Sequence, residues 1–195
     1  RLILLGFLFI TVYVNSQDIH WSQFNDNPLF QNPANVGGFQ GDFRFIGNFR
    51  DQWRNVSVPF QTFNVSIDRK AKNFNYGFYA FHDQAGDGKF KTIEMMGVVS
   101  KNFKITSDST HVLSAGINIG MNHRQVNTDA FYFDSQYNGY IFNPLLPTNE
   151  LFQTDRKTNL NLGTGLIYSY NLTKRHYAKI GLSAFNLNRP NQGFY

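Results

Sequence analysis

The strongest constraint on the fold of this chain is an alternation of apolar and polar residues with a period of two. The stretch "NLNLGTGLIYSYN", residues 159–171, shows it clearly. One set of alternate residues is mostly apolar and ends in Tyr168 and Tyr170, and the other set is mostly small or polar. Successive side chains of a β-strand point to opposite faces, so the alternation predicts a strand with one apolar face.

The same alternation recurs along the chain and predicts about seven strands in an all-β, antiparallel fold. Tyr79 and Phe81 interrupt the alternation in one segment, and residues 90–103 are the weakest case. The predicted strands are close to the ~9–11 residues that cross a bilayer at a tilt. Besides 159–171, the alternating segments are 42–53, 62–68, 73–81, 90–103, 111–124 and 177–186.

This alternation fits either a membrane barrel with its apolar face outward or a soluble sandwich with that face inward. The second, fourth and sixth predicted connections are short, whereas the fifth runs from Val126 to Lys157. Short turns at one end and longer loops at the other are typical of bacterial outer-membrane barrels. The polar face also carries Arg44, Arg50 and Asp68, which a dry core would exclude. We therefore favour a transmembrane outer-membrane β-barrel over an exported soluble β-sandwich that binds ligands.

Composition excludes several other classes of protein. Hydrophobic residues make up 42% of the chain, mean hydropathy is -0.37, and no apolar run outside the N-terminus approaches the ~20 residues of a spanning helix. There is no Cys, and the five His are dispersed, so no metal site is expected. We find no catalytic constellation and no cofactor motif, so an enzyme is not expected. The net charge of +5 comes from scattered Lys and Arg, which argues against nucleic-acid binding.

The N-terminus has the pattern of an export signal. An apolar run from Leu2 to Val14 precedes Asn15 and Ser16, and small residues suit cleavage after Ser16. Residues 1–16 are therefore predicted to be a signal peptide. Residues 17–41 are rich in Asn, Pro and Gly and are predicted to be irregular. Residues 42–195 are predicted to hold the barrel strands.

An ordered series of motifs opens the predicted mature chain: "QDIHWSQFNDNPLFQNPANVGGFQGDFRF" (17–45), then "NFRDQW" (48–53) and "VPFQTFNVSID" (58–68). This series resembles the start of the PorP/SprF family of type IX secretion system outer-membrane proteins. Two later stretches, "FDSQYNGYIFNPLLPTNE" (133–150) and "IGLSAFNLNRPNQGF" (180–194), are also similar to that family, although Asn186 stands where the family usually has His. The resemblance covers nearly all of the predicted mature chain. The N-terminal motif falls on Gln17, Asp18, His20, Trp21, Ser22, Gln23, Phe24, Asn27, Pro28, Asn32, Pro33 and Ala34, followed by Gln52 and Trp53.

The resemblance implies an outer-membrane barrel of the type IX secretion and gliding machinery that supports secretion or surface attachment of cargo. Its implied partners are outer-membrane lipid and either a secreted adhesin with a C-terminal sorting domain or periplasmic secretion-ring components. A diffusion or uptake barrel is the alternative function. Family members usually continue with further strands, and bacterial single-chain barrels have an even strand number, so we expect a partial barrel here.

Two segments are candidate interaction sites. The fifth connection is rich in aromatic side chains, which are favoured at binding surfaces. It either holds a secreted partner or folds over the barrel mouth with its rings packed together. The N-terminal Asn/Pro segment either fills the lumen, lies across the periplasmic mouth or contacts a periplasmic partner. The candidate partner-binding residues of the fifth connection are Phe131, Tyr132, Phe133, Tyr137, Tyr140 and Phe142.

Overall fold

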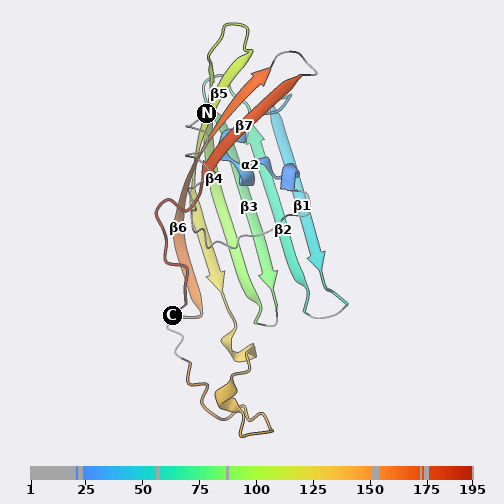
Figure 1. The fold of residues 1–195 in the computed structure, drawn as a ribbon, viewed down its shortest axis with the longest axis vertical. Coiled ribbons are helices and arrows are strands. Elements are labelled where there is room, and N and C mark those ends of the chain that lie inside the picture. Colours follow the sequence, from blue (N-terminus) through green and yellow to red (C-terminus); the bar gives the residue numbers. More distant parts are fainter. Residues whose placement is uncertain are drawn as a thin grey trace, which may run out of the picture.

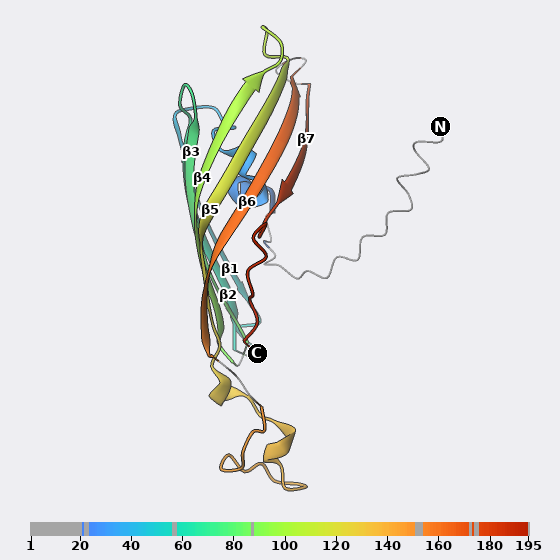
Figure 2. The same cartoon turned by 90° about the vertical axis from the view of Figure 1, so that its left-hand side faces the viewer.

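The computed structural model describes residues 21, 24–55, 58–86, 88–150, 154–171, 173 and 176–194. The expected signal peptide, residues 1–16, and the motif residues His20, Ser22 and Gln23 lie outside the described residues. In the part of the chain that is described, seven antiparallel strands form one sheet, which curls into a half-barrel (Figures 1 and 2). The all-β antiparallel fold predicted from the alternation is confirmed.

Neighbouring strands in the sheet are also neighbours in the sequence, so the sheet is an up-and-down meander in which β1 and β7 form the two edges. The strands are β1 (Phe43–Gln52), β2 (Phe60–Arg69), β3 (Asn75–Ala85), β4 (Phe90–Lys104), β5 (His111–Gln125), β6 (Arg156–Asn171) and β7 (Tyr177–Ala184). The short helices are η2 (Phe24–Asp26), α2 (Pro28–Gln31), η3 (Pro33–Asn35), η4 (Thr128–Ala130) and η5 (Asp134–Gln136). None of the described helices is long and apolar enough to cross a membrane.

The two faces of the sheet differ as the alternation predicts. On β5, Ile117 and Ile119 are 62% and 54% exposed on the convex face, while Asn118 between them is buried on the concave face. Cross-strand partners point to the same face, so the neighbouring strands have the same two faces as β5. Ile117, for example, pairs with Val99 of β4 and with Thr164 of β6. Large apolar side chains on the convex face include Phe45, Phe49, Phe63, Ile67, Phe78, Met95, Met121, Leu160, Leu166, Ile180 and Leu182.

The convex apolar band is about as tall as the hydrocarbon core of an outer membrane. On β5 it runs from Leu113 to Met121, which is about 27 Å along the strand at ~3.4 Å per residue. At a tilt of ~40° this spans about 20 Å across the membrane, close to the ~25 Å band of known barrels. His111 and His123 flank the band on the same strand. The apolar face of the sheet is therefore its convex, outward face, as in a membrane barrel.

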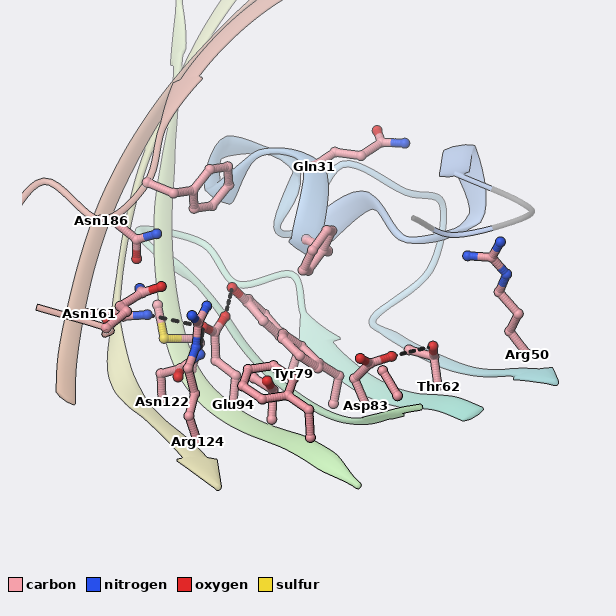
Figure 3. Close-up of a pocket in the computed structure, with 18 of the residues that line it drawn as sticks. Gln31, Arg50, Thr62, Tyr79, Asp83, Glu94, Asn122, Arg124, Asn161 and Asn186 are labelled. Atoms are coloured by element: carbon pink, nitrogen blue, oxygen red, sulfur yellow. Dashed lines mark hydrogen bonds between the residues drawn. The ribbon is translucent and has the colours of Figure 1, made fainter. Parts of the chain in front are cut away.

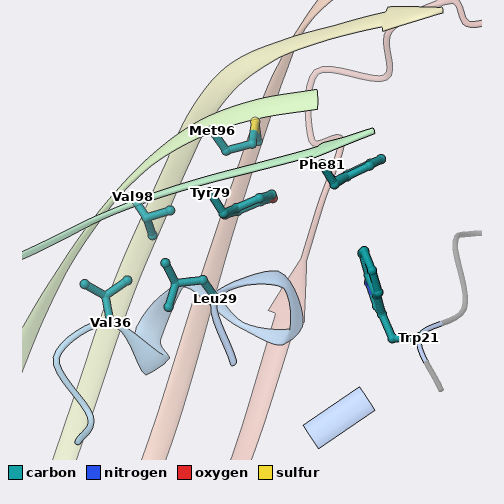
Figure 4. Close-up of a cluster of buried hydrophobic side chains, with 7 residues drawn as sticks. All are labelled: Trp21, Leu29, Val36, Tyr79, Phe81, Met96 and Val98. Carbon is teal, nitrogen blue, oxygen red and sulfur yellow. The ribbon is translucent and has the colours of Figure 1, made fainter. Parts of the chain in front are cut away.

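Tyr79 and Phe81, which interrupt the alternation, point to the concave face. There they join a small hydrophobic cluster that pairs the sheet with the N-terminal segment (Figure 4). Inward apolar residues of β4 complete the wall side of the cluster. The alternation is interrupted here because one patch of the concave face is apolar and is covered by the N-terminal segment. The cluster consists of Trp21, Leu29, Val36, Tyr79, Phe81, Met96 and Val98.

The connections lie at the two ends as predicted, but their lengths differ less than expected. The C-terminal ends of β2, β4 and β6, which lead into the connections to β3, β5 and β7, lie at one end, called here the short-turn end (Figure 1). At the opposite end, called here the long-loop end, only the segment 126–155 is long. At that end the β3–β4 connection is shorter than the turns opposite and the β1–β2 connection is only slightly longer, so the contrast in loop length rests mainly on the β5–β6 connection.

Arg in place of Ile117 is expected to lower the free energy of unfolding by about 2–4 kcal/mol, because it places a charge near the middle of the convex apolar band, which we expect to contact lipid. Arg in place of His123, on the same face of β5 at its long-loop end, is the matched control and is expected to cost about 0–1 kcal/mol. Denaturant unfolding of both variants in phospholipid vesicles measures the difference. Equal costs would show that the convex face does not contact lipid.

Candidate functional site

The concave face of the half-barrel is occupied by residues 24–42, called here the plug (Figures 1 and 2). Two Asn-Pro pairs shape it. Pro28 is the first residue of α2, and Pro33 is the first residue of η3. Proline suits the first helical position because its fixed φ is already helical and its missing N–H would have no helical partner there. The repeated motif therefore produces two tight turns that pack against the sheet.

Asn32 connects the second of these turns to the far side of the sheet. Its side-chain oxygen accepts a 2.8 Å hydrogen bond from the N–H of Ala34 and so caps η3. Its Nδ2 donates to the carbonyl oxygens of Leu166 at 3.2 Å and Leu182 at 3.0 Å. One side chain thus satisfies a helix end and binds both β6 and β7.

Further polar bonds hold the plug to β1, β2 and β4. The Oδ1 of Asn27 accepts from the side-chain amides of Asn48 at 2.7 Å and Asn64 at 2.5 Å. The hydroxyl of Ser100 donates to the carbonyl oxygen of Val36 at 2.8 Å. The plug is therefore bonded to strands around the whole curl of the sheet rather than to one strand.

A buried ion pair joins the barrel wall to the plug. Arg44 of β1 donates from Nε and Nη2 to the two carboxylate oxygens of Asp68 of β2, both at 2.9 Å. Asp68 is also bonded by the backbone N–H of Gly37 at 2.9 Å, and Arg44 donates to the carbonyl oxygen of Asn35 at 3.2 Å. Charge-assisted bidentate pairs are among the stronger hydrogen bonds, and here both partners also bind plug backbone.

Glycines on the concave face make room for the plug. Gly116 of β5 and Gly165 of β6 are cross-strand partners. A Cβ on Gly116 would overlap the backbone of Pro33, and one on Gly165 would overlap the side chain of Asn32. The "GTG" stretch of β6 is thus a place of close backbone packing, as glycine within a strand often indicates.

Between the plug and the long-loop end lies a cavity of about 810 Å³ (Figure 3). At this cavity the carboxylate of Glu94, on β4, accepts three hydrogen bonds. The Tyr79 hydroxyl donates to Glu94 Oε1 at 3.3 Å, and the amides of Asn122 and Asn161 donate to Oε2 at 3.0 and 3.1 Å. Sequence analysis did not single out Glu94, although its place on the polar side of a weakly alternating strand was a usable signal.

Charged, polar and aromatic side chains share the wall of this cavity. The plug bounds the cavity on one side, and inward residues near the long-loop ends of the strands line its other sides (Figure 3). The hydroxyl of Thr62 donates to Asp83 at 2.6 Å on one side. Other lining residues are Phe24, Phe30, Arg50, Phe60, Phe90, Arg124, Ser183 and Asn186.

The described residues of the predicted N-terminal motif lie inside the curl of the sheet, and most of them are buried there. Trp21 is buried with its ring 5.9 Å from Phe30 and 6.5 Å from Phe81. Phe24 is exposed toward the cavity, and Pro28 starts α2 as described above. Of the three placements open from the sequence, the structure shows the Asn/Pro segment inside the curl of the sheet.

The described part of the aromatic connection, residues 126–150, extends beyond the strand ends instead of folding back over the concave face (Figures 1 and 2). Its base is closed by a backbone bond from Val126 to Asp155 at 3.0 Å. A second bond, from Asn127 to Gly88 at 2.8 Å, ties the base to the β3–β4 turn. We therefore treat this segment as a protruding unit at the long-loop end.

Five of the six predicted aromatic residues form two groups of contacting rings. The Phe131 and Phe133 ring centroids are 6.2 Å apart near the base. The Phe142 ring lies 4.8 Å from Tyr132 and 5.6 Å from Tyr137. The sixth residue, Tyr140, is 99% exposed at the tip. The rings thus pack on one another, as one interpretation of the segment expected, and still leave aromatic surface exposed; binding of a secreted partner stays a prediction.

The comparisons with known proteins agree with the resemblance noted in the sequence. A family model described as the type IX secretion system membrane protein PorP/SprF matches residues 13–195, which is almost the whole chain. No curated protein and no solved structure matches the chain.

Ala in place of Gly116 is expected to displace the second turn of the plug, because the new Cβ meets backbone that cannot rotate away. Overpacking of this kind costs about 1–3 kcal/mol. Hydrogen exchange at residues 34–38 should accelerate. Ala in place of Gly47, which lies on the convex face with open space around it, is the matched control and should leave that exchange unchanged. Slow exchange in both variants would contradict the packing described.

Proposed function

The chain belongs to the PorP/SprF family of type IX secretion system membrane proteins, and on that premise we propose that it is an outer-membrane barrel supporting secretion or surface attachment of cargo proteins. The observation that carries the membrane placement is the convex band of exposed apolar side chains. The observation that favours an interaction role is the plug, which fills the curl of the sheet where a pore would need open space. The role is structural and not enzymatic.

The proposed orientation of the barrel in the outer membrane follows from the long connection between β5 and β6. Bacterial outer-membrane barrels keep short turns in the periplasm and longer loops outside. We therefore propose that residues 126–155 lie on the cell surface and that the short-turn end faces the periplasm. The edge strands β1 and β7 would expose backbone groups to lipid, which is costly. We propose that further strands complete the barrel and cover both edges.

The partner proposed for the aromatic connection is a secreted adhesin with a C-terminal sorting domain. Exposed Tyr132, Tyr137 and Tyr140 lie beyond the strand ends, where a surface protein can reach them. Tyrosine is enriched among residues that dominate interface energy because its ring buries a large area and its hydroxyl bonds. Components of the periplasmic secretion ring are the alternative partners, and they would meet the opposite end.

Deletion of the gene is expected to remove a set of secreted and surface proteins, while uptake of small solutes stays unchanged. Mass spectrometry of the medium and of surface-shaved cells measures the first effect, and radiolabelled solute uptake measures the second. A mutant with normal secreted and surface proteins but reduced uptake would instead support a diffusion or uptake barrel.

Replacement of Tyr132, Tyr137 and Tyr140 together by Ser is expected to reduce retention of the surface partner by about 30-fold, the effect of losing about 2 kcal/mol of interface energy. The barrel should still insert, because strand pairing and lipid burial hold it. Whole-cell labelling of the partner measures retention. Leu145→Ser, a change at an equally exposed apolar residue of the same segment, is the matched control.

Insertion of an epitope tag beside Asn138 tests the orientation on which this depends. Antibody should bind the tag on intact cells, because Asn138 lies in the exposed tip. Binding only after the outer membrane is permeabilised would invert the proposed topology. Normal partner retention in the triple Ser variant, with the tag exposed on intact cells, would overturn the role of the rings while leaving the topology standing.

A further inference from the structure

The charges of the described residues are unevenly divided between the two ends of the sheet. At the long-loop end acidic and basic residues are mixed, as in the exposed pair of Asp155 with Arg156 at 3.7 Å. The short-turn end has an excess of cations, and its described acidic residues outside the ion pair with Arg44 are Asp42 and Asp108. We call these cations the basic rim: Arg69, Lys70, Lys72, Lys101, Lys104 and Lys179.

Two residues of the basic rim, Arg69 and Lys101, point outward from the convex face, among the apolar side chains nearest the short-turn end. Arg69 follows Ile67 by two positions on β2, and Lys101 follows Val99 by two positions on β4. The register places Arg69 opposite Tyr76, and Tyr76 opposite Val99. Arg69 and Lys101 are thus two strands apart and two residues out of step, about 12 Å between Cα atoms. Both long side chains can reach one group lying between them.

Aromatic rings hold both cations against the sheet. The Arg69 guanidinium lies 5.2 Å from the centroid of the Phe43 ring. The Lys101 ammonium lies 4.9 Å from the Phe74 ring and 5.5 Å from the Phe103 ring. A cation over an aromatic face is attracted by the ring quadrupole and keeps a defined place at an interface. These cations are therefore positioned beside apolar surface rather than extended into water.

Two of the nearby acidic residues, Asp68 and Asp108, are engaged elsewhere. Asp68 is buried, points to the concave face and is bonded by Arg44. In the β4–β5 turn, Asp108 accepts 2.6 and 3.0 Å bonds from the hydroxyl and N–H of Thr110. The Thr110 hydroxyl above all holds the pKa of Asp108 below its usual range, so Asp108 stays charged within its own turn. Among the described residues, neither Arg69 nor Lys101 forms an ion pair.

From this geometry we propose that Arg69 and Lys101 bind the phosphate of anionic glycerophospholipids in the membrane leaflet at the short-turn end. The convex band beside them supplies a surface for the acyl chains, and the rest of the basic rim raises the local attraction for anions. The site depends on the proposed membrane placement and adds a lipid headgroup to it. Lipid phosphate from lipopolysaccharide would belong to the other leaflet, and hence to the opposite end.

The test uses the purified full chain in detergent, with phosphatidylglycerol as the probe and phosphatidylcholine as the neutral reference. Native mass spectrometry measures the dissociation constant of retained lipid. The double variant Arg69→Gln, Lys101→Gln is expected to bind phosphatidylglycerol about 30-fold more weakly, equivalent to about 2 kcal/mol for two cations near a membrane surface. Affinity of the wild-type chain should fall with added salt.

Two further variants separate a lipid site from a general effect of charge. Arg69→Lys with Lys101→Arg retains both cations and should retain binding. Lys91→Gln with Arg156→Gln removes outward cations at the long-loop end, which are also separated by one strand, and should change binding less than 3-fold. An equal loss in that control pair, or preference of the wild-type chain for lipid A over phosphatidylglycerol, would overturn the proposal.

Insertion into vesicles is measured separately on the same proteins, by protease protection of the strands. If the wild-type chain inserts but does not prefer phosphatidylglycerol to phosphatidylcholine, the headgroup site is wrong and the membrane placement stands. If the wild-type chain does not insert, the placement and the site fail together. Insertion of the Gln variant with weakened lipid binding would support both.

Discussion

The contact between Asp68 and Arg44 is the interaction on which the rest of the structure depends. The two residues are cross-strand partners of β1 and β2, and both point to the concave face. A slip of β1 by one residue would turn Arg44 toward lipid and leave the Asp68 carboxylate buried without its cation. Replacing such a pair by apolar residues is often neutral in stability, so its value here is in fixing register and position.

The same pair determines where the plug lies. Gly37 and Asn35 contribute the backbone groups that complete its hydrogen bonds, so the chain must pass this point of the wall. From there the plug reaches Gly116 and Gly165, where the sheet has no side chains in the way. The ion pair thus fixes the position of the plug near β1 and β2. Against β5 and β6, the plug can pack closely because Gly116 and Gly165 have no side chains. Polar bonding and steric fit act on the same segment.

The strands and their faces could be predicted because both depend on a local pattern. The alternation along residues 159–171 needs no knowledge of distant residues, and it correctly assigned an outward face to Leu166 and Tyr168. The inward position of Tyr79 could not be predicted in this way, because it depends on Leu29 and Phe30 packing over it from a segment about fifty residues earlier. The hydrogen bonds of the Glu94 carboxylate could not be predicted either, since its three donors come from three different strands.

The plug begins the described chain, yet its partners are spread over the strands that follow. Asn32 bonds to carbonyl oxygens 134 and 150 residues later, and Gln31 accepts from Ser183, 152 residues later. Contacts of such long sequence separation form slowly, because the entropy of closing the loop is lost before the contact contributes. The bonds of Asn32 and Gln31 to β6 and β7 can therefore form only once these strands have joined the sheet. A plug with all of its bonds thus marks a sheet whose assembly has reached its seventh strand.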